Sequence, residues 1–181
     1  GYEEVANKFV SNVLHKIKEC PDDYNYYQIK APWLQIKILK IVQLISPSLL
    51  NPETVGYLKE FIEDTGKKTY ATTMNETKSV RFYSKYCIFF EVINVVDHLN
   101  AKLPTKIFDT YVSILGNFLK EDSNKYPNKD INTKYLALDG MAKLAKYSSG
   151  DRILKEHSTI IYSSLKDNDI SKIGRASCRE R

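Results

Sequence analysis

The chain has 181 residues, 43% of them hydrophobic, and its 27 basic and 22 acidic side chains give a formal charge of +5. This length suits one domain or one stretch of a longer array, and it can bury a core without metal or disulfide staples. The apolar runs, such as residues 87–90, fall far short of the ~18 residues that a membrane span requires. We expect no secretory leader, because no basic and then apolar segment opens the sequence.

The last nine residues differ in composition from the rest of the chain. Residues 173–181 hold three arginines, whereas the preceding 172 residues hold two arginines and 22 lysines. Their sequence, IGRASCRER, is also similar to the translation of a sequencing-library adapter. We therefore interpret residues 1–172 as the native segment and residues 173–181 as a non-native tail. Without the tail, 24 basic and 21 acidic side chains remain, and so small an excess does not indicate nucleic-acid binding.

The first half of the chain predicts helices. An apolar residue recurs at every fourth position of the first segment, namely at Val5, Phe9, Val13 and Ile17, and Val10 and Leu14 widen this stripe. Pro21 ends this helix, and a tyrosine-rich connector leads to a second helix that Pro32 opens. The second helix continues to Ile45 and is apolar on nearly every side, so we expect it to be buried.

Start and stop residues divide the remaining chain. Asn51 and Pro52 predict a cap and a first turn, and Gly66 predicts the end of that third helix. The polar stretches 65–78 and 121–130 lack a helical period, so we expect loops there. The further predicted helices are 79–99, one from Pro104, 132–147 and 151–165. The total is seven helices with no convincing strand.

An internal echo suggests the architecture. Residues 129–132 (KDIN) are repeated as residues 168–171 (NDIS), a shift of 39 positions. A period near 40 built from helix pairs is typical of HEAT and armadillo arrays. We therefore predict an all-α, HEAT/armadillo-like right-handed solenoid of about three and a half helix pairs, cut from a longer array.

No group of residues predicts catalysis, a cofactor site or a metal site. His15, His98 and His157 fall on three different predicted helices, without ligands at metal-binding spacing. Cys20 and Cys87 match no metal or redox spacing, and we interpret them as reduced thiols in or near the core. The glycines are scattered and are expected mostly to end helices, so no phosphate-binding loop is predicted.

Two lysine groups could contact anionic lipid or acidic partners. Lys67 and Lys68 are adjacent, and Lys37 and Lys40 share one helix. We favour solvated side chains, because polybasic lipid sites usually need four to eight basic residues. The aromatic residues Phe82, Phe89 and Phe90 are predicted to lie in the core. The residues that bind partners are not identified by the sequence.

Four segments carry a family resemblance: residues 23–27 (DYNYY), 31–40 (APWLQIKILK), 89–93 (FFEVI) and 132–141 (NTKYLALDGM). In this order and approximate spacing they resemble the trunk of the adaptin large-subunit family, from about residue 20 to Lys172. The tyrosine-rich and Pro-Trp-Leu block is most similar to the alpha type. The gamma and epsilon types share the Phe-Glu and Tyr-Leu landmarks, and Lys30 replaces a proline that is usual in the family.

The resemblance implies a non-catalytic scaffold of a clathrin adaptor complex, acting in endocytosis and protein transport at the plasma membrane. It implies a heterotetramer with beta-type large, medium and small chains, and membrane contact through phosphoinositide-binding parts outside this segment. No nucleic-acid partner or cofactor is implied. The alternatives are a gamma-type or epsilon-type subunit, an unrelated helical-repeat carrier such as a nuclear transport receptor or phosphatase scaffold, and an enzyme accessory domain.

Overall fold

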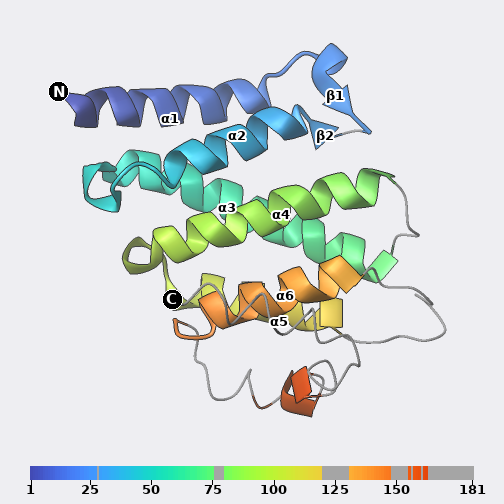
Figure 1. The fold of residues 1–181 in the computed structure, drawn as a ribbon. Helices are drawn as coiled ribbons and strands as arrows, with labels where there is room; N and C mark the ends of the chain where they lie inside the picture. The colour runs from blue at the N-terminus through green and yellow to red at the C-terminus, as the bar shows by residue number, and fades with distance from the viewer. Residues whose placement is uncertain are drawn as a thin grey trace. The chain divides into compact units, whose positions relative to one another are not determined.

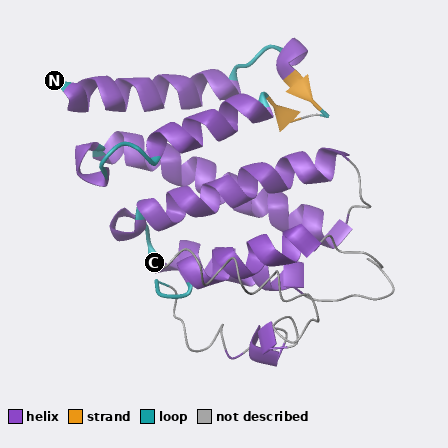
Figure 2. Ribbon diagram, viewed as in Figure 1, coloured by secondary structure: helices purple, strands orange, loops and turns teal. Residues whose placement is uncertain are grey.

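The computed structural model describes residues 1–27, 29–75, 80–119, 131–147, 155, 157–159 and 161–162. The chain divides into two compact units, Gly1–Pro104 and Thr105–Arg181. The described residues are helical apart from their connections and one small hairpin, as Figure 2 shows, so the predicted all-α class is confirmed.

The first unit is built from four α-helices: α1 (Tyr2–Lys18), α2 (Pro32–Val42), α3 (Pro52–Asn75) and α4 (Val80–His98). Successive helices run in opposite directions (Figure 1). α1 packs on α3 and α2 packs on α4, while α1 also contacts α2 and α3 contacts α4. Alternate helices therefore form two layers, which is the packing expected of a HEAT-like array.

The connection from α1 to α2 contains a small hairpin that the sequence analysis did not predict. After the 3-10 turn η1 (Asp22–Tyr24), strand β1 (Asn25–Tyr26) pairs with the antiparallel strand β2 (Ile29–Lys30). Tyrosine and isoleucine favour such pleated pairs. Tyr27 has a φ of 46°, a left-handed conformation that is uncommon for a residue with a side chain. The expected connector therefore contains one short pair of antiparallel strands.

The predicted apolar stripe of α1 is only partly buried. Val10, Leu14 and Ile17 face the unit, as predicted, together with the polar Asn7, whereas Val5 and Phe9 are exposed. Both sets recur at helical spacing, so periodicity alone did not separate them. The polar Asn7 decides the orientation because it bonds to a distant part of the chain, as described below.

The prediction that α2 is buried is only half right. Its inward side, containing Gln35, Ile38, Leu39 and Val42, is buried against the rest of the unit. Its outward side exposes Trp33, Leu34 and Ile41, and Leu44 follows in the next turn. The helix lies at the surface of a layer, so its neighbours α1 and α4 cover one side only.

The prediction that Gly66 ends the third helix is wrong, as is the loop predicted from residue 65. α3 continues to Asn75, and Leu58, Ile62, Gly66 and Thr69 form one buried stripe along it. The small residues Gly66 and Thr69 continue the helical period without a large apolar side chain. A glycine inside a helix costs only about 1 kcal/mol, which tertiary packing overrides.

The 3-10 turns η2 (Pro47–Leu49) and η3 (Asn100–Lys102) complete the first unit. Its core includes fully buried residues of α3 and α4, such as Leu58, Ile62, Phe89 and Val92. Phe89 therefore occupies the predicted core and Phe90 its margin. The side chain of Phe82 lies outside the described part of the structure.

In the second unit, α5 (Thr105–Leu119) packs on α6 (Ile131–Leu144). Beyond α6, the described residues 155, 157–159 and 161–162 are helical, as the sequence predicts. Gly116 of α5 lies directly against the His157 ring. The prediction that glycines mostly end helices is wrong, since Gly56, Gly66, Gly116 and Gly140 lie inside helices. Residues 121–130, the second half of the echo at 168–171 and the tail lie outside the described residues.

Candidate functional site

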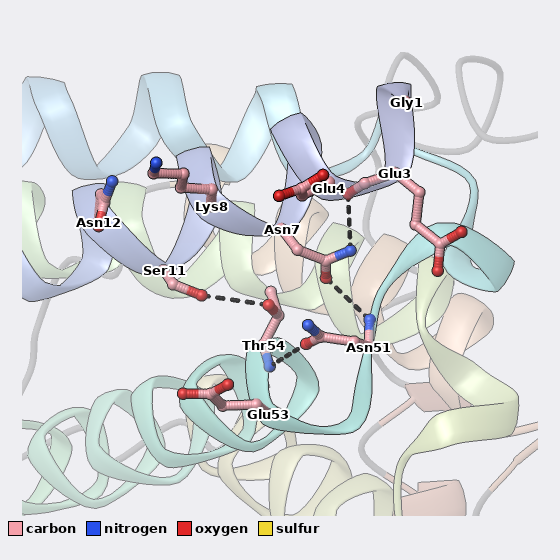
Figure 3. Close-up of a pocket in the computed structure, with 10 residues that line it drawn as sticks. All are labelled: Gly1, Glu3, Glu4, Asn7, Lys8, Ser11, Asn12, Asn51, Glu53 and Thr54. Carbon is pink, nitrogen blue, oxygen red and sulfur yellow. Dashed lines mark hydrogen bonds between the residues drawn. The ribbon is translucent and has the colours of Figure 1, made fainter.

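The candidate site is an open groove between the first half of α1 and the start of α3 (Figure 3). Its volume is about 600 Å³. Its lining is polar: Gly1, Glu3, Glu4, Asn7, Lys8, Ser11 and Asn12 from the α1 side, and Asn51, Glu53 and Thr54 from the α3 side. The site therefore joins the two helices of one layer.

Asn7 is the centre of this joint. Its Nδ2 donates to the carbonyl oxygens of Glu3, at 2.8 Å, and of Leu49, at 2.6 Å. Its Oδ1 accepts from the backbone N–H of Asn51 at 2.8 Å. The side chain is only 6% exposed, and these three bonds satisfy both ends of its amide. Asn7 thus fixes the chain that leads into α3 onto α1.

The first turn of α3 completes the network. The Asn51 side chain caps the helix, because its Oδ1 accepts from the backbone N–H of Thr54 at 2.8 Å. The Thr54 hydroxyl lies 3.1 Å from the hydroxyl of Ser11. The cap predicted at Asn51 is therefore confirmed, whereas Asn7 was missed. A polar residue within an apolar helical period was the available indication.

The same connection is held from the other side of the unit. The His98 Nε2 lies 2.8 Å from the carbonyl oxygen of Ile45, and Lys102 Nζ donates to that of Leu50 at 2.8 Å. We call residues 45–51 the α2–α3 connector. Its backbone is bonded by side chains from α1, from the last residue of α4 and from η3, so three separate parts of the unit hold it.

The groove offers charge without reactive chemistry. Glu3, Glu4 and Glu53 give it an acidic rim, which Lys8 partly offsets. Histidine and cysteine are absent from the lining, and Asn7, Ser11, Asn51 and Thr54 bond to one another or to the backbone. Such an arrangement holds helices together or contacts a polar partner. It lacks a nucleophile paired with a base.

The three histidines are not brought together. His15 is exposed on α1, and its Nε2 lies 3.8 Å from Glu19 Oε1. His98 at the end of α4 contacts the connector at Ile45, and His157 is buried in the second unit. Within the described ranges, no three His, Cys, Asp or Glu side chains gather closely enough to hold a metal ion.

The two cysteines and the two lysine groups that the sequence analysis considered lie apart from the groove. Cys20 is half-buried and Cys87 is exposed on α4, so the expectation of a near-core thiol is wrong for Cys87. Lys68 pairs with Asp64 at 2.6 Å on the exposed side of α3. Lys37 and Lys40 project from the outward side of α2.

Among the helices that the structure describes, none is both long and apolar enough to cross a bilayer.

Of three comparisons with known proteins, one finds relatives of this chain. No family model matches the chain, and no solved structure matches it. AP-2 complex subunit alpha-1 of Arabidopsis thaliana is 29% identical over 163 residues, 90% of this chain and 15% of the relative. AP-2 complex subunit alpha-2 of Dictyostelium discoideum is 30% identical over 182 residues, 97% of this chain and 17% of the relative. AP-4 complex subunit epsilon of Arabidopsis thaliana is 28% identical over 172 residues, 93% and 16% respectively.

The layered helical array of this chain matches subunits of adaptor complexes along nearly all of its length. The chain belongs to the adaptin large-subunit family. It spans about one sixth of the length of these curated relatives, since it covers 15–17% of each.

Proposed function

We propose that this chain is part of the trunk of an alpha-type adaptin and serves as a scaffold in clathrin-dependent endocytosis. The observation that carries the proposal is the match to AP-2 alpha subunits of a plant and an amoeba over 90% and 97% of the chain. Scaffolding also suits the structure, because the polar side chains of the groove join helices and present no reactive group.

The proposed partners are the beta-type large, medium and small chains of a heterotetramer. The complex would act at the cytoplasmic face of the plasma membrane in clathrin-coated pits, with phosphoinositide contact made by parts outside this segment. The relatives' names, which place them in AP complexes, support a multi-subunit assembly.

We further propose that residues 1–172 are one segment of a longer solenoid and that residues 173–181 are non-native. The exposed apolar side chains of α1 support the first part, because Tyr2, Val5 and Phe9 recur at helical spacing without cover. A preceding helix of a longer chain would bury them. The arginine-rich composition of the tail supports the second part.

The second candidate is an epsilon-type subunit of an AP-4 complex, which the 28% identity to the Arabidopsis epsilon subunit over 93% of the chain keeps open. Tagging the gene that encodes this sequence and identifying the co-purified chains distinguishes the two. Recovery of AP-2-type medium and small chains, with the tag in clathrin-coated pits, is the expected result. AP-4-type chains would favour the second candidate. Importin cargo or a phosphatase catalytic chain would overturn both.

A further inference from the structure

The outward side of α2 exposes several large apolar side chains close together in the sequence. Trp33 is 49% exposed, Leu34 36%, Ile41 38% and Leu44 85%. We call these four residues with Lys37 and Lys40 the α2 outer face. The aromatic surface extends onto the hairpin, since the Tyr26 ring packs edge-on against Trp33 with centroids 6.2 Å apart.

The α2 outer face differs from the solvent-facing side of a typical surface helix, which is polar. A helix that is apolar on all sides is normally buried on all sides. The buried residues Gln35, Ile38, Leu39 and Val42 form the inward side of α2. The apolar residues on the opposite side are partly exposed and lie outside the buried core of the first unit. Contiguous exposed apolar surface of this kind marks an interaction site.

The spacing on the face specifies the kind of partner. Leu34, Lys37, Ile41 and Leu44 follow each other at intervals of three, four and three residues. This is the a/d spacing at which one helix packs along another, with each side chain inserted between four of its partner. The stretch from Leu34 to Leu44 is about 15 Å long at helical rise, or roughly three turns. An amphipathic helix of similar length fits it.

The charges on the face specify the sign of the partner. Lys37 occupies a seam position, and Lys40 occupies the flanking position that sets partner choice in helix pairs. α2 contains no acidic residue, and no ion pair with a described residue holds either lysine. The acidic group that α4 presents nearby, Glu91, already accepts from Gln43 Nε2 at 2.6 Å. The apolar seam thus carries two positive charges that intramolecular carboxylates do not neutralise.

An anionic membrane fits the face less well. Polybasic lipid sites typically gather four to eight basic residues, whereas this face offers Lys37 and Lys40. The exposed residues Asp22 and Asp23 precede the hairpin and add negative charge to this end of the unit, which does not favour an anionic membrane. A partner helix, by contrast, needs acidic side chains only at the positions that face Lys37 and Lys40. It need not contact the hairpin, because the seam begins at Leu34.

We propose that the α2 outer face docks an acidic amphipathic helix of a partner protein. Leucine-like side chains of the partner pack between Leu34, Ile41 and Leu44, and its carboxylates pair with Lys37 and Lys40. The proposal does not depend on the type of adaptor complex, since it rests on the exposed seam of α2 itself.

Trp33 provides the assay, because it is the one tryptophan in the chain and lies at the end of the seam. The probe is a synthetic helix of about 21 residues, long enough to be helical, with leucine at a and d positions and glutamate at the flanking ones. Titration into the full chain is expected to shift Trp33 emission to shorter wavelength. A second probe with lysine in place of each glutamate should bind at least about tenfold more weakly, since like charges oppose pairing.

Charge reversal tests the register. Lys37→Glu is expected to weaken binding of the acidic helix about tenfold and to strengthen binding of the lysine-containing helix, because the same pair is restored with opposite signs. Lys67→Glu is the matched control, since it makes the same charge change at an exposed lysine of α3 and should change either affinity less than twofold. A structural defect would not produce rescue by the lysine-containing helix.

Three results would overturn the proposal. The first is no emission shift with the acidic helix, and the second is equal affinity for the two helices. The third is an equal loss of binding in Lys37→Glu and Lys67→Glu. Vesicles containing phosphatidylserine serve as the competing ligand: a shift with vesicles but not with the helix would identify a membrane surface instead.

Discussion

Replacing Gly116 by alanine should destabilise the second unit, although the same change inside a helix is normally favourable. A Cβ built on Gly116 would collide with Cε1 and Nε2 of the His157 ring. The His157 ring is only 6% exposed, so it has little space into which to move. Overpacking of this kind typically costs about 1–3 kcal/mol.

Gly56 provides the matched control, because it also lies inside a helix and a Cβ added there would meet no other atom within 4 Å. Gly56→Ala should stabilise the chain by up to about 1 kcal/mol through helix propensity alone. Gly116→Ala gains the same helix-propensity term but also carries the overpacking cost, so its net loss of stability is up to about 2 kcal/mol. The difference between the two variants, roughly 1–3 kcal/mol, isolates the contact with His157.

Urea unfolding followed by circular dichroism, with amide hydrogen exchange to assign the change to α5, measures both variants. His157→Ala in the Gly116→Ala background should recover part of the lost stability, because it removes the colliding ring and the two sites are coupled. If Gly116→Ala proved as stable as Gly56→Ala, the close approach of α5 to His157 would be wrong.

Three further outcomes are expected. Asn7→Ala should lower the free energy of unfolding by roughly 2–4 kcal/mol, since it leaves a carbonyl and an N–H of the connector unpaired, whereas the exposed Asn12→Ala should have little effect in the same urea titration. Equal losses in both would contradict the joint described for Asn7. Truncation after Lys172 should shift the thermal midpoint by no more than about 2 °C, and a larger fall would mean that the tail is packed. Lys68→Ala should cost less than about 0.5 kcal/mol, because its pair with Asp64 is solvated; a loss above about 1 kcal/mol would show a stronger role for that pair.

Local chemistry made part of the fold predictable. Pro32 opens α2 and the Asn51 side chain caps α3, as the sequence predicts, because each effect depends on neighbours within a few positions. The end of α3 was mispredicted because Gly66 and Thr69 continue a buried stripe without large apolar side chains. That these small residues are buried becomes visible only when the helices that pack on α3 are known.

The candidate site was harder to predict because its bonds join distant positions. Asn7 bonds to Leu49 and Asn51, which lie 42 and 44 residues away. Nothing in the local sequence of α1 indicates these acceptors and donors. The two apolar stripes of α1 are equally periodic, so the choice between them depends on this long-range joint. The outer face of α2 was missed for the same reason, since burial is decided by neighbouring helices.

The α2–α3 connector has a consequence for the order in which the chain folds during synthesis. Asn7 can bond to the connector only after Leu49 and Asn51 have been synthesised. The bonds to Ile45 and Leu50 form later still, because His98 and Lys102 lie 53 and 52 residues beyond them. Until then, the carbonyls of the connector remain hydrated. The nascent chain should therefore gain stability in one late step, when the last turn of the first unit leaves the ribosome. In this unit all four helices must therefore be present before the connector has its full set of hydrogen bonds.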